Sequence, residues 1–255
     1  MTNNNSIHQT AIVSGKAKIG KNVTIGQFTT IYDNVEIADN TIIEGYCELG
    51  VQNHLSNNEF LYIGPNSHIR SKSVFYEGSR FEEKLITGHR VTVREKTIVG
   101  KNLQIGTLSD IQGHCIIGDY VRMHSNVHIG QKSKIGNFIW IFPYVVLTND
   151  PHPPSEVSQG VEVEDFAVIS TMSVILPGIK VSKGCLIGAN SLLSIQTEEN
   201  MLYSGNPAKK VCVTSRIRLK DGTRKPAYPW TKHFHKGYPE EVIKDWEMLN
   251  HEGIL

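Results

Sequence analysis

The segment IGTLSDIQGHCIIGDYVRMHSNVHIGQKSKIGNFIWI, residues 105–141, places a large apolar side chain at every sixth position. These positions are Ile105, Ile111, Ile117, Met123, Ile129, Ile135 and Ile141. A strand alternates with a period of two and a helix repeats every 3.6 residues or so, and neither period alone gives six. A short strand followed by a bend, repeated three times per coil, does give it. The segment therefore predicts a parallel β-helix of triangular cross-section with eighteen residues per coil.

The same repeat continues on both sides of this segment. Its apolar anchor positions form three runs, Ile7 to Leu49, Ile63 to Leu147 and Val163 to Leu193. Within these runs only Thr87 is polar. Small residues often stand four positions after an anchor, and glycine often follows an anchor directly. We interpret the anchors as the interior, the small residues as sites where coils crowd, and the glycines as bends. The prediction is an all-β domain of about ten coils over residues 1–210.

The repeat is interrupted twice and then ends. The longer interruption contains Pro151, Pro153 and Pro154, and we expect residues 149–160 to form a loop that leaves one corner of the coil. Loops on a rigid scaffold are common places for functional sites. Residues 211–255 form a basic tail, in which residues 239–249 predict a short amphipathic helix. Val242, Trp246 and Leu249 share its apolar face.

Composition and charge exclude several classes of function. The chain has 255 residues and a formal net charge of +1, so a groove for nucleic acid is not expected. Its four cysteines are too few for a disulfide scaffold, and Cys47, Cys115 and Cys185 occupy small inward positions. The N-terminus lacks the pattern of a signal peptide, and the longest apolar run is too short to span a bilayer. We expect a cytoplasmic protein without a membrane partner.

Residues eighteen apart become neighbours on adjacent coils, so the repeat predicts columns of side chains. One column contains Glu95, Gly113, Gln131 and Asn149, and the next contains Lys96, His114, Lys132 and Asp150. Both reach the corner where the loop leaves, and Gly113 leaves a gap, as a small polar substrate would need. A third column brings Asp110 beside His128, which we interpret as a surface or subunit-contact pair. Trp140, Phe142 and Tyr144 form an outward apolar patch that predicts a partner surface near the loop.

With these repeats the chain resembles the hexapeptide-repeat acyltransferases of the left-handed β-helix fold, over about residues 7–210. The resemblance implies a left-handed coil and a homotrimer with active sites between subunits. The segment VVLTNDPHPPS, residues 145–155, is similar to the loop of N-acyltransferases that act on nucleotide-linked amino sugars, especially dTDP-3-amino-3,6-dideoxyhexoses. This likeness implies acyl transfer from acyl-CoA to the sugar amine, in the synthesis of surface polysaccharide such as O-antigen.

The same resemblance implies roles for individual residues. It assigns the catalytic site to Asp150, Asn149, Gln131 and His114, with Asp150 as first choice to hold the amine and take its proton. It assigns substrate binding to Glu95, Arg94 and His89, in the segment GHRVTVRE of residues 88–95, and to His152 before Pro153. It assigns coenzyme A to Thr171, Ala189, Ser194 and Lys209.

Three alternatives stay open at this point. A 4-amino sugar or a UDP-linked sugar is compatible with the same motifs. A zinc enzyme like the γ-class carbonic anhydrases would use His114, His124 and His128, although no metal is expected for the leading hypothesis. A β-helix scaffold without catalytic activity is the third. In a direct amine transfer, the protein orients the amine, accepts a proton and stabilises the thioester oxyanion, and a substrate-assisted route without a protein base is also compatible.

Overall fold

Short strands stack into three sheets in the computed structural model of the chain. The structure describes residues 4–251, except for the side chains of residues 250 and 251. The first sheet contains β1 (Ser6–Ile7), β4 (Thr24–Ile25), β7 (Ile42–Ile43), β10 (His68–Ile69), β13 (Ile86–Thr87), β16 (Gln104–Ile105), β19 (Arg122–Met123), β22 (Trp140–Ile141), β25 (Val168–Ile169), β28 (Leu186–Ile187), β30 (Met201–Gly205) and β31 (Ala208–Val213). The second contains β2 (Ile12–Val13), β5 (Thr30–Ile31), β8 (Glu48–Val51), β11 (Val74–Tyr76), β14 (Thr92–Val93), β17 (Asp110–Ile111), β20 (His128–Ile129), β23 (Val146–Leu147), β26 (Val174–Ile175) and β29 (Leu192–Leu193). The third contains β3 (Lys18–Ile19), β6 (Val35–Ile37), β9 (Leu61–Ile63), β12 (Arg80–Phe81), β15 (Ile98–Val99), β18 (Ile116–Ile117), β21 (Lys134–Ile135), β24 (Glu162–Val163) and β27 (Lys180–Val181).

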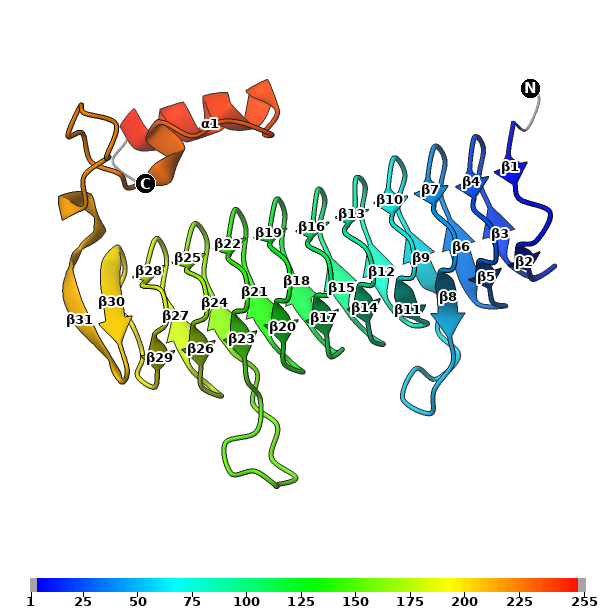
Figure 1. Cartoon of the computed structure of the whole chain (residues 1–255), viewed down its shortest axis with the longest axis horizontal. Helices are drawn as coiled ribbons and strands as arrows, with labels where there is room; N and C mark the ends of the chain where they lie inside the picture. Colours follow the sequence, from blue (N-terminus) through cyan, green and yellow to red (C-terminus); the bar gives the residue numbers. More distant parts are fainter. Residues whose placement is uncertain (1–3, 252–255) are drawn as a thin grey trace.

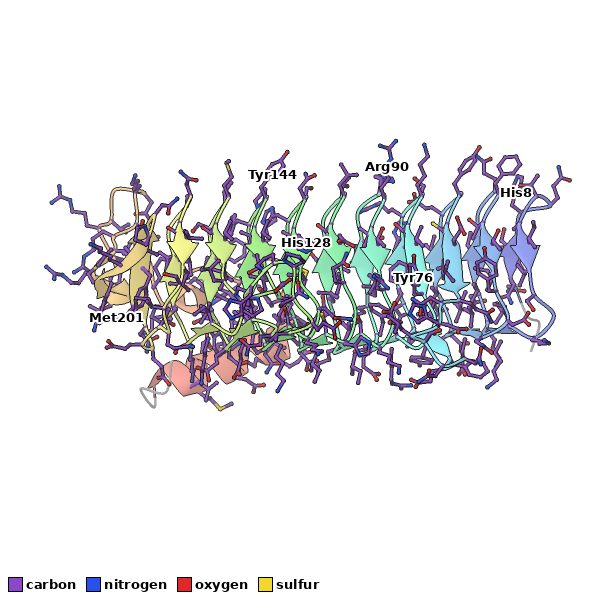
Figure 2. All side chains as sticks on the ribbon, turned by 90° about the horizontal axis from the view of Figure 1, so that it is seen from below. His8, Tyr76, Arg90, His128, Tyr144 and Met201 are labelled. Atoms are coloured by element: carbon purple, nitrogen blue, oxygen red, sulfur yellow. The ribbon has the colours of Figure 1, made fainter. Side chains whose placement is uncertain are left out.

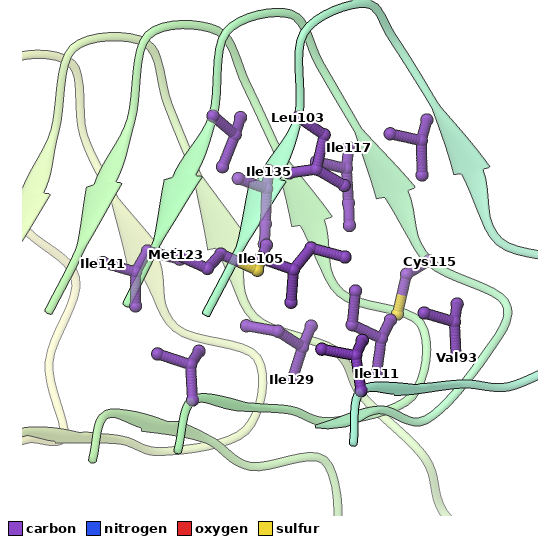
Figure 3. Packing of buried hydrophobic residues seen from close by; sticks show 14 of the residues in the cluster. Val93, Leu103, Ile105, Ile111, Cys115, Ile117, Met123, Ile129, Ile135 and Ile141 are labelled. Atoms are coloured by element: carbon purple, nitrogen blue, oxygen red, sulfur yellow. The ribbon is translucent and has the colours of Figure 1, made fainter. Parts of the chain in front are cut away.

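The register of the sheets confirms the eighteen-residue coil. Each strand pairs in parallel with the strand one coil away, as Ile111 does with Ile129. Figure 1 shows the result as a straight prism of successive coils, about eleven in number. The anchors fill its interior: Figure 3 shows Ile105, Met123 and Ile141 in line along it, and all three are at most 4% exposed. The interior of the prism is therefore a narrow core, to which each strand contributes its apolar anchor.

The glycines that directly follow the anchors do not form the bends that the sequence predicted. Apart from Gly50, whose φ is +87°, their φ angles are not in the left-handed region. That region is instead occupied by the residue three positions after an anchor, such as Asn102 or Tyr120. A Cβ built on Gly106 would lie 2.3 Å from the carbonyl carbon of His124 on the next coil. Glycine is thus needed because two coils approach each other closely, and not because the chain bends there.

Thr87, the one polar anchor, is completely buried at a break in the first sheet. The pairing of β10 with β13 includes His68 and Ile86 but does not extend to Ile69 and Thr87. The Arg70 backbone N–H donates to the Thr87 hydroxyl instead, at 2.9 Å. The side chain of Thr87 therefore replaces a backbone acceptor of the ladder.

Replacing Thr87 with valine should destabilise the protein, although valine is more apolar and has nearly the same shape. The Arg70 N–H would lose its acceptor, at a cost of about 1–3 kcal/mol in the free energy of unfolding. Urea unfolding of the wild type and Thr87→Val measures this difference. A variant as stable as the wild type, or more stable, would contradict the role given to the hydroxyl.

Two loops leave the prism at the same corner, where the chain passes from the second sheet to the third. Residues 52–60 join β8 to β9, and residues 149–160 join β23 to β24. Figure 1 shows both loops projecting on one side, with the C-terminal tail on the other. The predicted loop at residues 149–160 is therefore confirmed, and a second loop stands on the same edge.

The tail folds back against the first sheet. After the antiparallel hairpin of β30 and β31, it contains the 3-10 helices η1 (Thr214–Arg216) and η2 (Trp230–Lys232), and α1 (Glu240–His251). The predicted apolar face of the helix is confirmed: Val242 and Trp246 are buried and Leu249 is half-buried. Trp246 meets the Phe138 ring edge-on at 5.1 Å. Within residues 4–251, no helix has both the length and the apolarity to cross a membrane.

This docking changes the interpretation of the aromatic patch. Trp140 lies on the first sheet and donates a hydrogen bond from Nε1 to the Tyr238 hydroxyl of the tail at 2.9 Å. Phe142 stacks on His124 at 4.7 Å, while Tyr144, in the same connection between β22 and β23, projects outward from the edge of the coil and is 58% exposed. The three residues therefore do not form one patch, and they do not lie near the loop of residues 149–160.

Candidate functional site

Gln131 and Asn149 come together at the corner where the second loop leaves. Each follows a strand of the second sheet, β20 or β23, and these strands are neighbours. Gly130 makes the approach possible, because a Cβ on it would lie 3.2 Å from the Asn149 Cβ and 2.6 Å from the Leu147 carbonyl oxygen. The loop returns to the same point, where the Gln159 N–H donates to the Asn149 carbonyl at 2.8 Å. The predicted neighbours are thus fixed by backbone packing.

The Asp150 carboxylate stabilises the conformation of the loop of residues 149–160 through hydrogen bonds. Its carboxylate accepts hydrogen bonds from the Ser155 hydroxyl at 2.6 Å, the Ser155 N–H at 3.0 Å and the His152 N–H at 2.9 Å. These bonds, that of the Ser155 hydroxyl above all, keep the pKa of Asp150 below its ordinary value despite the opposing effect of desolvation. A carboxylate with a lowered pKa and engaged oxygens is a weaker base than the one expected at this position.

Glu95 differs more from its expected role, because its side chain is completely buried. Its Oε2 accepts from the Asn53 amide at 2.6 Å and from Arg94 Nε at 3.2 Å, and its Oε1 accepts from Arg94 Nη2 at 3.3 Å. The carboxylate cannot contact a substrate directly. It fixes Arg94, which lies over the Tyr76 ring at 5.7 Å and remains one-third exposed.

A second buried carboxylate, one coil earlier, anchors the first loop together with Glu95. Glu77 is 1% exposed and accepts from the Ser56 hydroxyl at 2.6 Å and from the Asn34 amide at 2.9 Å. Ser56 and Asn53 both belong to the loop of residues 52–60. Two buried charges that accept hydrogen bonds from one loop define its position far more closely than exposed contacts would.

Glu95 should make stability depend on pH. Burial raises its pKa, but the hydrogen bonds from its own backbone, Asn53 and Arg94 outweigh burial and leave the pKa below its ordinary value. The pKa of Glu95 is therefore lower in the folded state than in the unfolded state, where it is about 4.3. The ionised carboxylate stabilises the fold above that pH, and this stabilisation is lost as the pH falls through the folded-state pKa. Urea unfolding at several pH values below 5 or so tests this, because Glu95→Gln should lose less stability on acidification than the wild type. Equal losses would contradict it.

Asp110 and His128 form a hydrogen-bonded pair on the outer face of the second sheet. His128 Nδ1 lies 3.1 Å from Asp110 Oδ2, and the Gln112 amide donates to the same oxygen at 2.5 Å. Burial raises the pKa of Asp110, but these two hydrogen bonds and the charges of His128 and Arg94 outweigh it, so the pKa lies below its ordinary value. An ionised Asp110 orients the imidazole and leaves Nε2 to meet a substrate. Figure 2 shows His128 on this face, away from the edge that bears Arg90 and Tyr144.

The sequence predicted that these two residues would be neighbours, and the structure confirms it. The signal was present, since β14, β17 and β20 place Thr92, Asp110 and His128 in one column. Gln112 and Arg94 extend the pair toward the corner of Gln131. The pair thus lies in a group of polar side chains with Gln112 and Arg94.

The structure separates His89 from this surface. His89 lies at the corner between the first and second sheets, where its Nδ1 is 2.9 Å from the Ser71 hydroxyl and 3.9 Å from Glu44. His152 is exposed in the second loop. His114 does lie at the corner of Gln131, and its backbone N–H donates to the Glu95 carbonyl at 2.9 Å.

The three histidines of the zinc alternative stand on different parts of the coil. His114 is at a corner, His128 on the second sheet, and His124 next to the first sheet against Phe142. Burial lowers the pKa of His124. Across the described part of the chain, no group of three or more His, Cys, Asp or Glu side chains is placed to hold a metal ion. This geometry does not support the zinc alternative.

The four residues expected to bind coenzyme A are split between two corners and the hairpin. Thr171 and Ala189 are on adjacent coils, where the Asn190 N–H donates to the Thr171 carbonyl at 2.9 Å. Ser194 follows β29 at another corner, and Lys209 is exposed on β31 opposite Ser204. Only Thr171 and Ala189 are therefore brought together.

Comparisons with known proteins agree with this fold. Residues 3–50 match the family described as bacterial transferase hexapeptide (six repeats). An acyl-[acyl-carrier-protein]–UDP-N-acetylglucosamine O-acyltransferase of Thermodesulfovibrio yellowstonii is 29% identical over 163 residues, which cover 64% of this chain and 57% of that protein. The enzyme of the same name from Campylobacter concisus is 24% identical over 98% of this chain and 84% of its own length. The chain spans about half the length of the first three curated relatives it matches, from 43% to 57%.

Solved structures show the same architecture. The UDP-N-acetylglucosamine acyltransferase of Campylobacter jejuni matches with a TM-score of 0.57 and 20% identity, over 94% of this chain and 81% of that one. The Francisella novicida enzyme matches with a TM-score of 0.52 and 18% identity, over 96% and 78%. The predicted left-handed parallel β-helix is thus confirmed.

Proposed function

We propose that this chain, a member of the hexapeptide-repeat transferase family, is an acyltransferase that acylates the amino group of a nucleotide-linked sugar. The matched relatives carry names for O-acyl transfer to UDP-N-acetylglucosamine. The corner formed by Gln131 and Asn149 carries the proposal of an amine acceptor instead. Two amides there can orient an amine by hydrogen bonds, and a neutral amine is nucleophilic without first losing a proton, whereas a hydroxyl group is not.

An amine needs less help from the protein than a hydroxyl group does. With a pKa of about 8, a usable fraction of a sugar amine is neutral at pH 7 and nucleophilic. Gln131 and Asn149 would hold that amine toward the thioester carbon, and a backbone N–H at the coil bend would stabilise the oxyanion. His128, oriented by Asp110, would accept the proton that the attacking nitrogen releases. It would pass this proton to the sulfur of the acyl donor, which leaves as the free thiol when the thioester C–S bond breaks. Asp150 and His114 would shape the pocket on the side of the loop.

The proposed donor is an acyl-CoA with an acetyl or short hydroxyacyl group, and the proposed acceptor is a dTDP-linked 3-amino-3,6-dideoxyhexose. The motif of residues 145–155 and the corner amides support this pair. Since the relatives named above use an acyl carrier protein, acyl-ACP forms the second arm of any test. Both donors present the acyl group as a thioester. A homotrimer with sites between subunits belongs to the same proposal.

A matrix of donors and acceptors tests the proposal. Purified protein is incubated with acetyl-CoA or acetyl-ACP and with dTDP-linked 3-amino, dTDP-linked 4-amino or UDP-linked amino sugars, and products are identified by mass spectrometry. We expect an amide product that decreases about a hundredfold or more in Gln131→Ala and Asn149→Ala. Full activity in both variants would contradict the site, and no product in any combination would contradict the function.

A further inference from the structure

Two adjoining cavities lie in the tail, on the side of the prism away from the loops. One has a volume of about 580 Å³ and is lined in part by Thr214, Ser215, Lys225 and Lys232. The other has a volume of about 340 Å³ and is lined in part by Trp140, Phe142, Trp230 and Phe234. Leu219, Tyr228 and His233 line both, so the two cavities adjoin at these side chains. Their size is that of a site for a small organic ligand.

The smaller cavity, called the aromatic chamber below, is an open cavity lined mainly by aromatic side chains. The Trp140 indole is fixed by its hydrogen bond to the Tyr238 hydroxyl, and Trp230 Nε1 donates to the Phe166 carbonyl at 3.3 Å. Phe234 closes the rim, nearly perpendicular to Trp140 with ring centroids 5.6 Å apart, and is 38% exposed. Such walls suit a planar ring, which stacks against them without requiring their rearrangement.

The larger cavity offers positive charge. Lys225 and Lys232 line it, and neither forms an ion pair within 4.0 Å among the residues that the structure describes. They belong to the segment of residues 209–236, which contains nine Lys or Arg and a single acid, Asp221. Unpaired ammonium groups beside a cavity attract an anion, and phosphate is the anion that lysine binds most readily as a point charge.

We propose that this double cavity is a nucleotide-binding site, with the base in the aromatic chamber and the phosphates beside Lys225 and Lys232. A nucleotide carries a planar ring and phosphate in one molecule. The two cavities place a surface for a planar ring and a surface for phosphate side by side, and they adjoin at Leu219, Tyr228 and His233. The site is separate from the corner of Gln131 and is assessed by binding alone. The proposed function supplies two sources of such a ligand, the nucleotide of the coenzyme A donor and that of the nucleotide-linked sugar acceptor.

Calorimetric titration of the full chain with adenosine 3′,5′-bisphosphate and with dTDP separates the two sources. We expect saturable binding of at least one of them, about tenfold weaker in Lys232→Ala and in Phe234→Ala. Lys220→Ala is the matched control, because Lys220 is an exposed lysine of the same segment outside both cavities, and it should bind like the wild type. Thermal unfolding of each variant confirms that the tail remains folded.

Three outcomes would overturn the proposal. The first is that neither nucleotide binds. The second is that binding is equally strong in Lys232→Ala and Phe234→Ala, which would place the nucleotide elsewhere. The third is that dodecanoate, a single-chain anion without a ring, displaces the nucleotide competitively and binds more tightly, which would make the aromatic chamber a site for an acyl chain.

Discussion

Replacing Trp246 with alanine should release the tail from the prism. The indole is 1% exposed and packs edge-on against Phe138, Trp230 and Tyr238, with ring centroids 4.7 to 5.3 Å away. Removing a buried tryptophan costs about 3–5 kcal/mol. Because the prism has its own core, we expect residues 214–251 to unfold at lower urea concentration than the coils. Near-ultraviolet circular dichroism and hydrogen exchange measure the two parts separately.

Two further variants test whether packing, and not polarity, is responsible. Among the residues that the structure describes, the buried Trp246 Nε1 has no hydrogen-bond partner, so Trp246→Phe should retain most of the stability. Met248→Ala, on the exposed side of the same helix, should change stability by no more than about 0.5 kcal/mol. A single transition with an unchanged midpoint in Trp246→Ala would show that the helix does not stabilise the tail.

The second large effect should follow the loss of His128. In the proposed mechanism, its Nε2 accepts the proton of the amine, and Asp110 holds the ring in the required orientation. We expect kcat/KM for the amino sugar to fall about a hundredfold or more in His128→Ala, mainly through kcat. Asp110→Asn should show a smaller loss, because the imidazole remains but its orientation is no longer fixed.

The matched control is His8→Ala, which removes an exposed histidine from the first coil. It should leave kcat/KM unchanged. If His128→Ala also retains the wild-type kcat/KM, the proton does not pass through the imidazole, and a substrate-assisted route becomes the better account. Steady-state kinetics at fixed donor concentration distinguishes these results.

Much of the fold could be predicted because one structural rule generates it. A buried residue every sixth position, such as Ile111 or Ile129, fixes strand, corner and register together, and the columns follow by arithmetic. The close approach of coils at Gly106 could not be predicted, since it depends on the backbone of His124 one coil away. Thr87 has a similar origin, because its partner is a backbone group that the periodicity does not identify.

Contacts within the candidate site that follow from the eighteen-residue columns could be predicted. Contacts that a loop makes with the coils could not. Gln131 and Asn149 are neighbours because eighteen residues separate them. Buried Glu95 accepts a hydrogen bond from Asn53, which belongs to a loop outside the repeat. The packing of Trp140 against the tail likewise joins residues 98 positions apart, which no local pattern reveals.

The preference for an amine over a hydroxyl acceptor is the central claim, and a competition assay tests it most directly. Purified protein with acetyl-CoA is given equal amounts of a dTDP-linked 3-amino-3,6-dideoxyhexose and UDP-N-acetylglucosamine, and the ratio of amide to ester product is measured by mass spectrometry. The corner of Gln131 and Asn149 predicts amide as the dominant product. Ester formed on UDP-N-acetylglucosamine at an equal or higher rate would contradict the account.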